Sequence, residues 1–80
     1  MEMNFKNTQE AIKFGITATP EQIEFLRLRS LSRTKYAMKL IDENNLDDAS
    51  PVAFAAQLDR EASTATQILA EHPEFARLLA

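Results

Sequence analysis

The chain of 80 residues contains no cysteine, no tryptophan, one glycine, three prolines and one histidine. Without cysteine there is no disulfide framework, no thiol nucleophile and no thiolate zinc site. A single glycine excludes the glycine-rich loops that cradle phosphates, and no serine lies in a G-x-S-x-G nucleophile motif. These absences argue against catalysis. We therefore expect no enzymatic activity, no cofactor, no metal site and no small-molecule substrate.

Long apolar runs are also missing. No stretch approaches the roughly 20 apolar residues of a membrane span, and the N-terminus has no run typical of a signal peptide. We therefore expect a soluble, cytoplasmic protein that does not associate with membranes. A chain of this length forms one domain near the lower size limit for independent folding. Because no disulfide or metal compensates for the small core, a homodimer or a protein partner is favoured.

Capping signals and helical periodicity predict an all-α fold. We expect one domain over residues 1–80, built as a small compact bundle of three main helices plus one or two short terminal helices. Residues 1–6 are predicted to form a flexible tail. Asn7 is a suitable cap for a brief first helix, and Gly15 suits the left-handed residue just past its end.

The second helix has the clearest start signal. Thr19, Pro20 and Gln22 combine a capping hydroxyl, a proline at the first helical position and a reciprocal capping amide. The helix is predicted to begin at Pro20 and to extend as far as Glu43. Polar residues interrupt its apolar face over residues 30–34, so the sequence leaves two alternatives: one long helix with a polar middle, or two shorter helices.

A third helix is predicted to start at Ser50 and Pro51, by the same succession of cap and proline, and to end before Pro73. It is followed by a last short segment. Its apolar stripe has spacings of three and four: Phe54, Leu58, Ala62, Ala65 and Leu69. The phenylalanines are spread over the predicted helices, as expected for anchors of one core: Phe5, Phe14, Phe25, Phe54 and Phe75.

Positive charge is concentrated in one segment of an otherwise acidic chain. The net charge is −3, yet five of the nine basic residues lie within a stretch that has no acidic residue: Arg27, Arg29, Arg33, Lys35 and Lys39. One interpretation is that these cations pair with the acidic C-terminal half or lie in water. The other is that they contact an acidic partner.

The same segment carries apolar side chains that the main core does not need, and a surface rich in arginine and aromatic residues is typical of protein interfaces. We predict that the protein is a non-catalytic interaction module or small regulatory adaptor, which contacts a protein partner or a second copy through residues 25–39. The predicted contact residues are Phe25, Leu28, Arg29, Leu31, Arg33, Lys35, Tyr36 and Lys39.

A nucleic-acid-associated regulator is the alternative. Residues 9–26 partly match a helix-turn-helix motif, and the basic residues could contact phosphates. A recognition helix presents its N-terminal residues to base edges, and here these include Glu21 and Glu24, which phosphates repel. Nucleic-acid binding is therefore the less favoured prediction.

Overall fold

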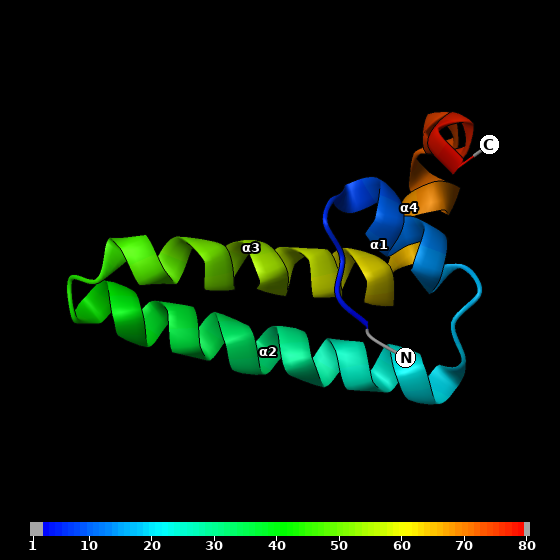
Figure 1. The fold of residues 1–80 in the computed structure, drawn as a ribbon. Helices are drawn as coiled ribbons and strands as arrows, with labels where there is room; N and C mark the ends of the chain where they lie inside the picture. Colours follow the sequence, from blue (N-terminus) through cyan, green and yellow to red (C-terminus); the bar gives the residue numbers. More distant parts are fainter. Residues whose placement is uncertain (1–2, 80) are drawn as a thin grey trace.

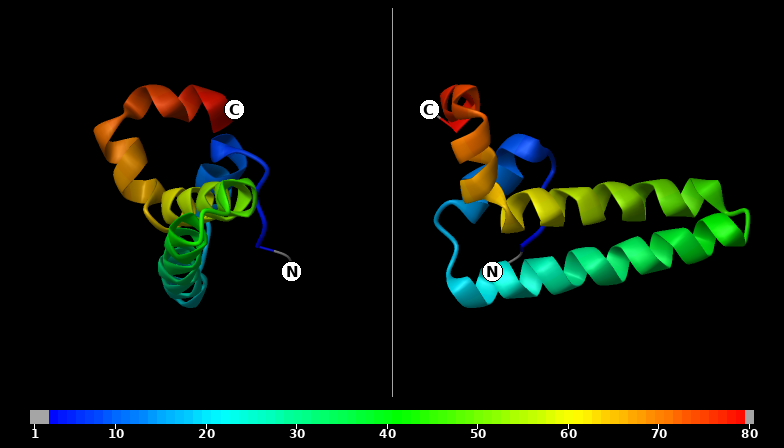
Figure 2. Two further views of the ribbon diagram at one scale, coloured as in Figure 1. Left: turned by 90° about the vertical axis from the view of Figure 1, so that its left-hand side faces the viewer. Right: turned by 180° about the vertical axis from the view of Figure 1, so that it is seen from behind.

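The structure is a computed structural model that describes residues 3–79. Over this range the chain forms four α-helices and a 3₁₀ helix, with no strand: α1 (Thr8–Gly15), α2 (Pro20–Asp42), α3 (Leu46–Ser63), α4 (Ala65–Glu71) and η1 (Pro73–Leu79). The predicted all-α fold is confirmed. Helices α2 and α3 form a long antiparallel hairpin, and α1 lies against the end of α3 away from the hairpin turn (Figure 1). From there α4 leaves the axis of α3, and η1 returns toward α1 (Figure 2).

Helix α2 is continuous, so the alternative of two shorter helices is excluded. The predicted capping box is present at its start. The Gln22 amide donates to Thr19 Oγ1 at 3.2 Å, and the Thr19 amide donates to Gln22 Oε1 at 2.9 Å. The polar middle is accommodated because Ser30, which is 8% exposed, donates from Oγ to the Ala56 carbonyl of α3 at 2.8 Å. A buried hydroxyl with such a partner does not interrupt a helix.

Helix α2 ends in a Schellman motif, in which Asn44 adopts the left-handed conformation with φ of 60°. The Asn44 amide donates to the Ile41 carbonyl, and the Asn45 amide donates to the Leu40 carbonyl. These two bonds satisfy carbonyls that the helix itself leaves free. The chain therefore reverses within Glu43 to Asn45 and enters α3 directly.

The start of α3 corrects the sequence prediction. The helix begins at Leu46, with Asn45 as its cap, and Pro51 lies inside it. The Asn45 side chain accepts a hydrogen bond from the Asp48 amide at 3.4 Å, so an earlier cap takes precedence over the Ser50 and Pro51 signal. Proline lacks an amide hydrogen, which leaves the Asp47 carbonyl without its usual helical donor.

The end of α3 is a second correction, because the helix predicted to continue to residue 72 breaks at Thr64 (φ −116°, ψ 17°). The hydroxyls of Ser63 and Thr64 both donate to the Arg60 carbonyl, at 2.9 Å and 2.8 Å. Such local side-chain bonds compete with the helical backbone pattern. The break changes the direction of the chain and creates α4.

The position of Gly15 is a third correction. Gly15 is the last residue of α1 and has no positive φ, so the predicted left-handed turn is wrong. A Cβ at this position would collide with the Ala62 carbonyl and would lie 2.6 Å from the Ala65 Cβ. Glycine is thus needed because α1 approaches the junction of α3 and α4 closely, and not because of a backbone turn.

The core lies where α1, α2 and α3 meet. Its buried centre consists of Ala11, Leu26, Leu58 and Ala62. Phe5 and Phe14 pack against this centre with ring centroids 5.4 Å apart. Phe25 and Phe54 are 48% and 50% exposed, so the prediction that they anchor the core is wrong. The exposure of Phe25 is what its other prediction, as a contact residue, requires.

The predicted tail at residues 1–6 is partly in contact with the fold. Met3 and Phe5 pack against the core, whereas residues 1 and 2 lie outside the described part of the chain. Within residues 3–79, every helix is too short or too polar to cross a membrane.

Candidate protein-contact surface

The eight predicted contact residues point in several directions, because consecutive residues of a helix are separated by about 100° around its axis. Arg29 and Arg33 turn toward α3. Leu31 lies on one flank of α2, and Phe25 and Tyr36 lie on the opposite flank. Leu28, Lys35 and Lys39 occupy the outer face, since they are separated by seven and four residues. The structure therefore does not gather the eight residues on one surface.

Arg29 and Arg33 are bound within the molecule. Both pair with Asp59 of α3, whose side chain is 1% exposed. Arg29 donates from Nε and Nη2 to the two carboxylate oxygens, each at 2.8 Å, and Arg33 donates from Nη1 to Oδ2 at 2.9 Å. Arg29 also donates to the Met3 carbonyl, and its guanidinium lies 5.3 Å from the Phe25 ring centroid. These two arginines therefore hold α2 against α3.

The remaining cations of α2 are on the surface. Arg27 forms an ion pair with Glu24 one turn earlier, with 2.6 Å between Nη2 and Oε1. The hydrogen bonds from Arg27 hold the pKa of the Glu24 carboxyl below its usual value, and the same bonds raise the pKa of Arg27. Lys35 and Lys39 are exposed, and within residues 3–79 neither forms an ion pair.

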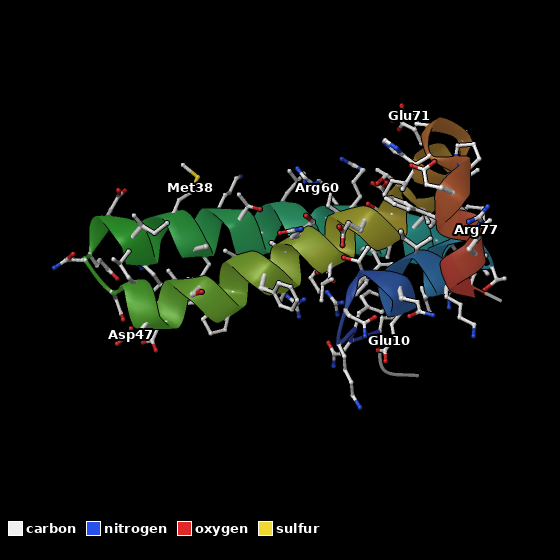
Figure 3. All side chains as sticks on the ribbon, turned by 90° about the horizontal axis from the view of Figure 1, so that it is seen from above. Glu10, Met38, Asp47, Arg60, Glu71 and Arg77 are labelled. Atoms are coloured by element: carbon white, nitrogen blue, oxygen red, sulfur yellow. The ribbon has the colours of Figure 1, made fainter. Side chains whose placement is uncertain are left out.

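An apolar groove runs along the hairpin on the side away from α1. Figure 3 shows Met38 of α2 and Arg60 of α3 on one edge of the hairpin, with Glu10 of α1 on the opposite edge. The groove is continuous toward the hairpin turn, because Ile41 and Ala53 line both its middle and its end. We call this surface the α2–α3 groove and define it by Thr34, Met38, Ile41, Leu46, Ala53, Gln57 and Arg60. Leu31 lies beside the groove on the same flank of α2, because it is seven residues, or about two turns, before Met38.

Four large apolar side chains are more than half exposed on this flank: Met38, Ile41 and Leu46 in the α2–α3 groove, and Leu31 beside it. The exposed fractions are 52% for Leu31, 60% for Met38, 51% for Ile41 and 59% for Leu46. Single exposed apolar residues are normal on soluble proteins. A larger apolar patch is unusual on a monomer and is typical of an interaction site. Ala49 and Ala53 lie between them on α3, and such small side chains allow another helix to approach closely.

Leu31 was among the predicted contact residues, and Met38 is one of the apolar residues of the 25–39 segment that were predicted to be surplus to the core. Ile41 and Leu46 lie outside the segment 25–39, so they were not predicted to take part in a contact. One signal could have found the groove: Leu31 and Met38, like Thr34 and Ile41, are seven residues apart, which is the repeat of a second helix-packing seam.

Comparison of the chain with protein-family models, curated proteins and solved structures finds no match. Among residues 3–79, no three His, Asp or Glu side chains are grouped so that they could hold a metal ion. The α2–α3 groove is therefore the feature from which a function can be inferred.

Proposed function

We propose that the protein is a non-catalytic protein-contact module that uses the α2–α3 groove to bind a helical surface. The row of four exposed apolar side chains from Leu31 to Leu46 is the observation that carries this proposal. A shallow channel between two antiparallel helices suits a third helix, which buries its apolar face there in helix-in-groove recognition. The proposal keeps the predicted protein-contact function and moves its centre from the cations of residues 25–39 to one flank of α2.

The hairpin is suited to this role because its own packing leaves the groove free. The pairing of Asp59 with Arg29 and Arg33 and the Ser30 bond to α3 fix the two helices relative to each other. Within the described residues, no buried side-chain nitrogen or oxygen lacks a hydrogen-bond partner. A preorganised surface of this kind loses little conformational entropy when a partner binds.

The nucleic-acid alternative stays a prediction without a structural observation in its favour. Three of the five clustered cations, Arg27, Arg29 and Arg33, already form ion pairs within the chain. Strong binding to DNA requires many cationic side chains to contact phosphates and release the counterions bound there. Arginines that already pair with carboxylates of the chain are not free to do so.

Site-specific photo-crosslinking in cells that naturally make the protein tests the proposal. A photoreactive amino acid is placed at Met38 or at Leu46, and in a control at Tyr36, which is 53% exposed. Tyr36 is two residues from Met38 and hence about 200° around the helix. We expect protein adducts from positions 38 and 46 and none from position 36. Adducts absent from both groove positions, or equally abundant at position 36, would contradict the proposal.

A further inference from the structure

The chain exposes more surface than is typical of a monomer of its mass. It exposes 5684 Å², whereas a folded monomer of 9.0 kDa is expected to expose about 4,850 Å². Its radius of gyration is 13.3 Å, compared with about 11.6 Å for a compact domain of this length. The excess of about 800 Å² reflects an elongated shape, and it is comparable in size with the surface that each partner buries in a standard stable interface.

The hairpin accounts for this elongated shape, with extents of 41 × 25 × 23 Å. Helix α1 covers only the end of α3 that is distant from the turn (Figure 1). Toward the turn, α2 and α3 form two layers with no further helix on the groove side (Figure 3). A pair of helices in water buries one stripe of each helix and leaves the others exposed. In a four-helix bundle, two further helices cover a second stripe of each.

We propose that the α2–α3 groove is occupied by the same groove of a second copy of this chain, which gives an antiparallel four-helix bundle with twofold symmetry. The proposal rests on the contact function proposed above and specifies the partner. Twofold contacts require a patch that is complementary to itself. The groove meets this condition by placing the large Met38 near the small Ala53, so that side chains of two copies can interdigitate.

Distances along the groove support the same arrangement. Leu31 lies seven residues before Met38, about 10 Å along the helix axis, and the hairpin turn lies at about the same distance beyond Met38. A twofold axis beside Met38 therefore brings Leu31 of each copy opposite Leu46 of the other. It also brings Arg60, at the far end of the groove, opposite the partner's turn.

Charge favours the antiparallel orientation. Four acidic residues surround the hairpin turn: Asp42, Glu43, Asp47 and Asp48. Within residues 3–79, none of these carboxylates and no group of Arg60 forms an ion pair. An antiparallel pair places each acidic turn near the partner's Arg60. A parallel pair would instead bring the acidic turns of both copies together, and such like-charge juxtaposition is unfavourable.

Sedimentation equilibrium of the purified chain over a wide concentration range tests the association. We expect a mass of twice 9.0 kDa at high concentration and reversible dissociation on dilution. Met38→Glu should weaken the dimer at least about tenfold, because it places an unpaired carboxylate in an apolar contact. Tyr36→Glu, on the opposite flank, should leave the dimer unchanged. Circular dichroism checks that both variants remain helical, which we expect because both side chains are more than half exposed.

Disulfide trapping tests the orientation, since the chain has no cysteine of its own. Leu31→Cys and Leu46→Cys chains are mixed and oxidised. The antiparallel dimer predicts disulfides mainly between position 31 of one chain and position 46 of the other. Dominant 31–31 and 46–46 disulfides would overturn the antiparallel arrangement.

The two proposals fail in different ways. A purified chain that is monomeric at every concentration overturns the dimer. If the chain is monomeric but photo-crosslinking at Met38 captures a different protein, the proposed contact function still holds and only the identity of the partner changes. A monomer without groove adducts contradicts both proposals.

Discussion

Asp59 is a carboxylate with almost no contact with water, and two guanidinium groups surround it. Removing an ion from water is costly, and attraction within the pair compensates for this only when the geometry is good. Here three hydrogen bonds of 2.8 to 2.9 Å join the groups. The sequence indicated that the cations of residues 25–39 could pair with acidic residues of the C-terminal half. The sequence alone could not identify Asp59 as the partner, because that identification depends on how α2 is aligned with α3.

Replacement of Asp59 by alanine should strongly destabilise the fold. It leaves Arg29 and Arg33, whose side chains are only 19% and 29% exposed, without their counterion. We expect the free energy of unfolding to fall by about 3 kcal/mol or more, as measured by urea denaturation followed by circular dichroism. Lys35→Ala, at an exposed position on the outer face of α2, is the control and should change the free energy of unfolding by less than about 0.5 kcal/mol. A loss below about 1 kcal/mol for Asp59→Ala would show that water compensates for the missing carboxylate.

Gly15→Ala should have two opposite effects on stability, one from helix propensity and one from steric fit. Inside a helix, alanine is more favourable than glycine by about 0.5 to 1 kcal/mol. At this position the added Cβ meets the Ala62 carbonyl and the Ala65 side chain, and overpacking of this kind costs about 1 to 3 kcal/mol. We therefore expect Gly15→Ala to lower the melting temperature. Lys13→Ala, on the exposed face of α1, is the control and should change the melting temperature little. A higher melting temperature for Gly15→Ala would mean that α1 can move away from α3 without loss of stability.

The helix ends show which structural signals are local. The bounds of α2 were predictable, because the capping box at Thr19 and the Asn44–Asn45 reversal act within a few residues. The start of α3 was not predictable, because two capping signals five residues apart compete there and the later one includes a proline. The break at Thr64 was also missed, because it depends on side-chain bonds to the Arg60 carbonyl that alternative rotamers would not make.

The left-handed residue between α2 and α3 gives a test of the hairpin connection. Asn44 has φ of 60°, a conformation that glycine adopts freely and that β-branched residues strongly resist. Asn44→Val should destabilise the protein by about 1 to 2 kcal/mol, whereas Asn44→Gly should leave its stability equal or slightly higher. Urea denaturation of both variants measures the difference. Equal stabilities would indicate that the connection can adopt another turn without loosening the hairpin.

The shape of the whole molecule decides which apolar residues are available for contact. The sequence indicated surplus apolar residues in 25–39, and two of them are exposed on one flank of α2: Met38 in the groove and Leu31 beside it. The other wall of the groove belongs to α3. Its register against α2 is set by contacts between residues that are distant in the sequence, such as Ser30 with Ala56. The composition could therefore predict that apolar side chains remain exposed on α2, but not which flank of α2 carries them.

A self-associating fold should gain thermal stability with concentration, because binding that is specific to the folded state shifts the unfolding equilibrium by mass action. Over a roughly hundredfold range of protein concentration, we expect the melting temperature to rise by about 5 to 10 °C. Met38→Glu should remove this dependence, and Tyr36→Glu should retain it. Calorimetry or circular dichroism at several concentrations measures the effect. A melting temperature of the unmodified chain that is independent of concentration would mean that the exposed row from Leu31 to Leu46 does not contribute to folding stability through a second copy.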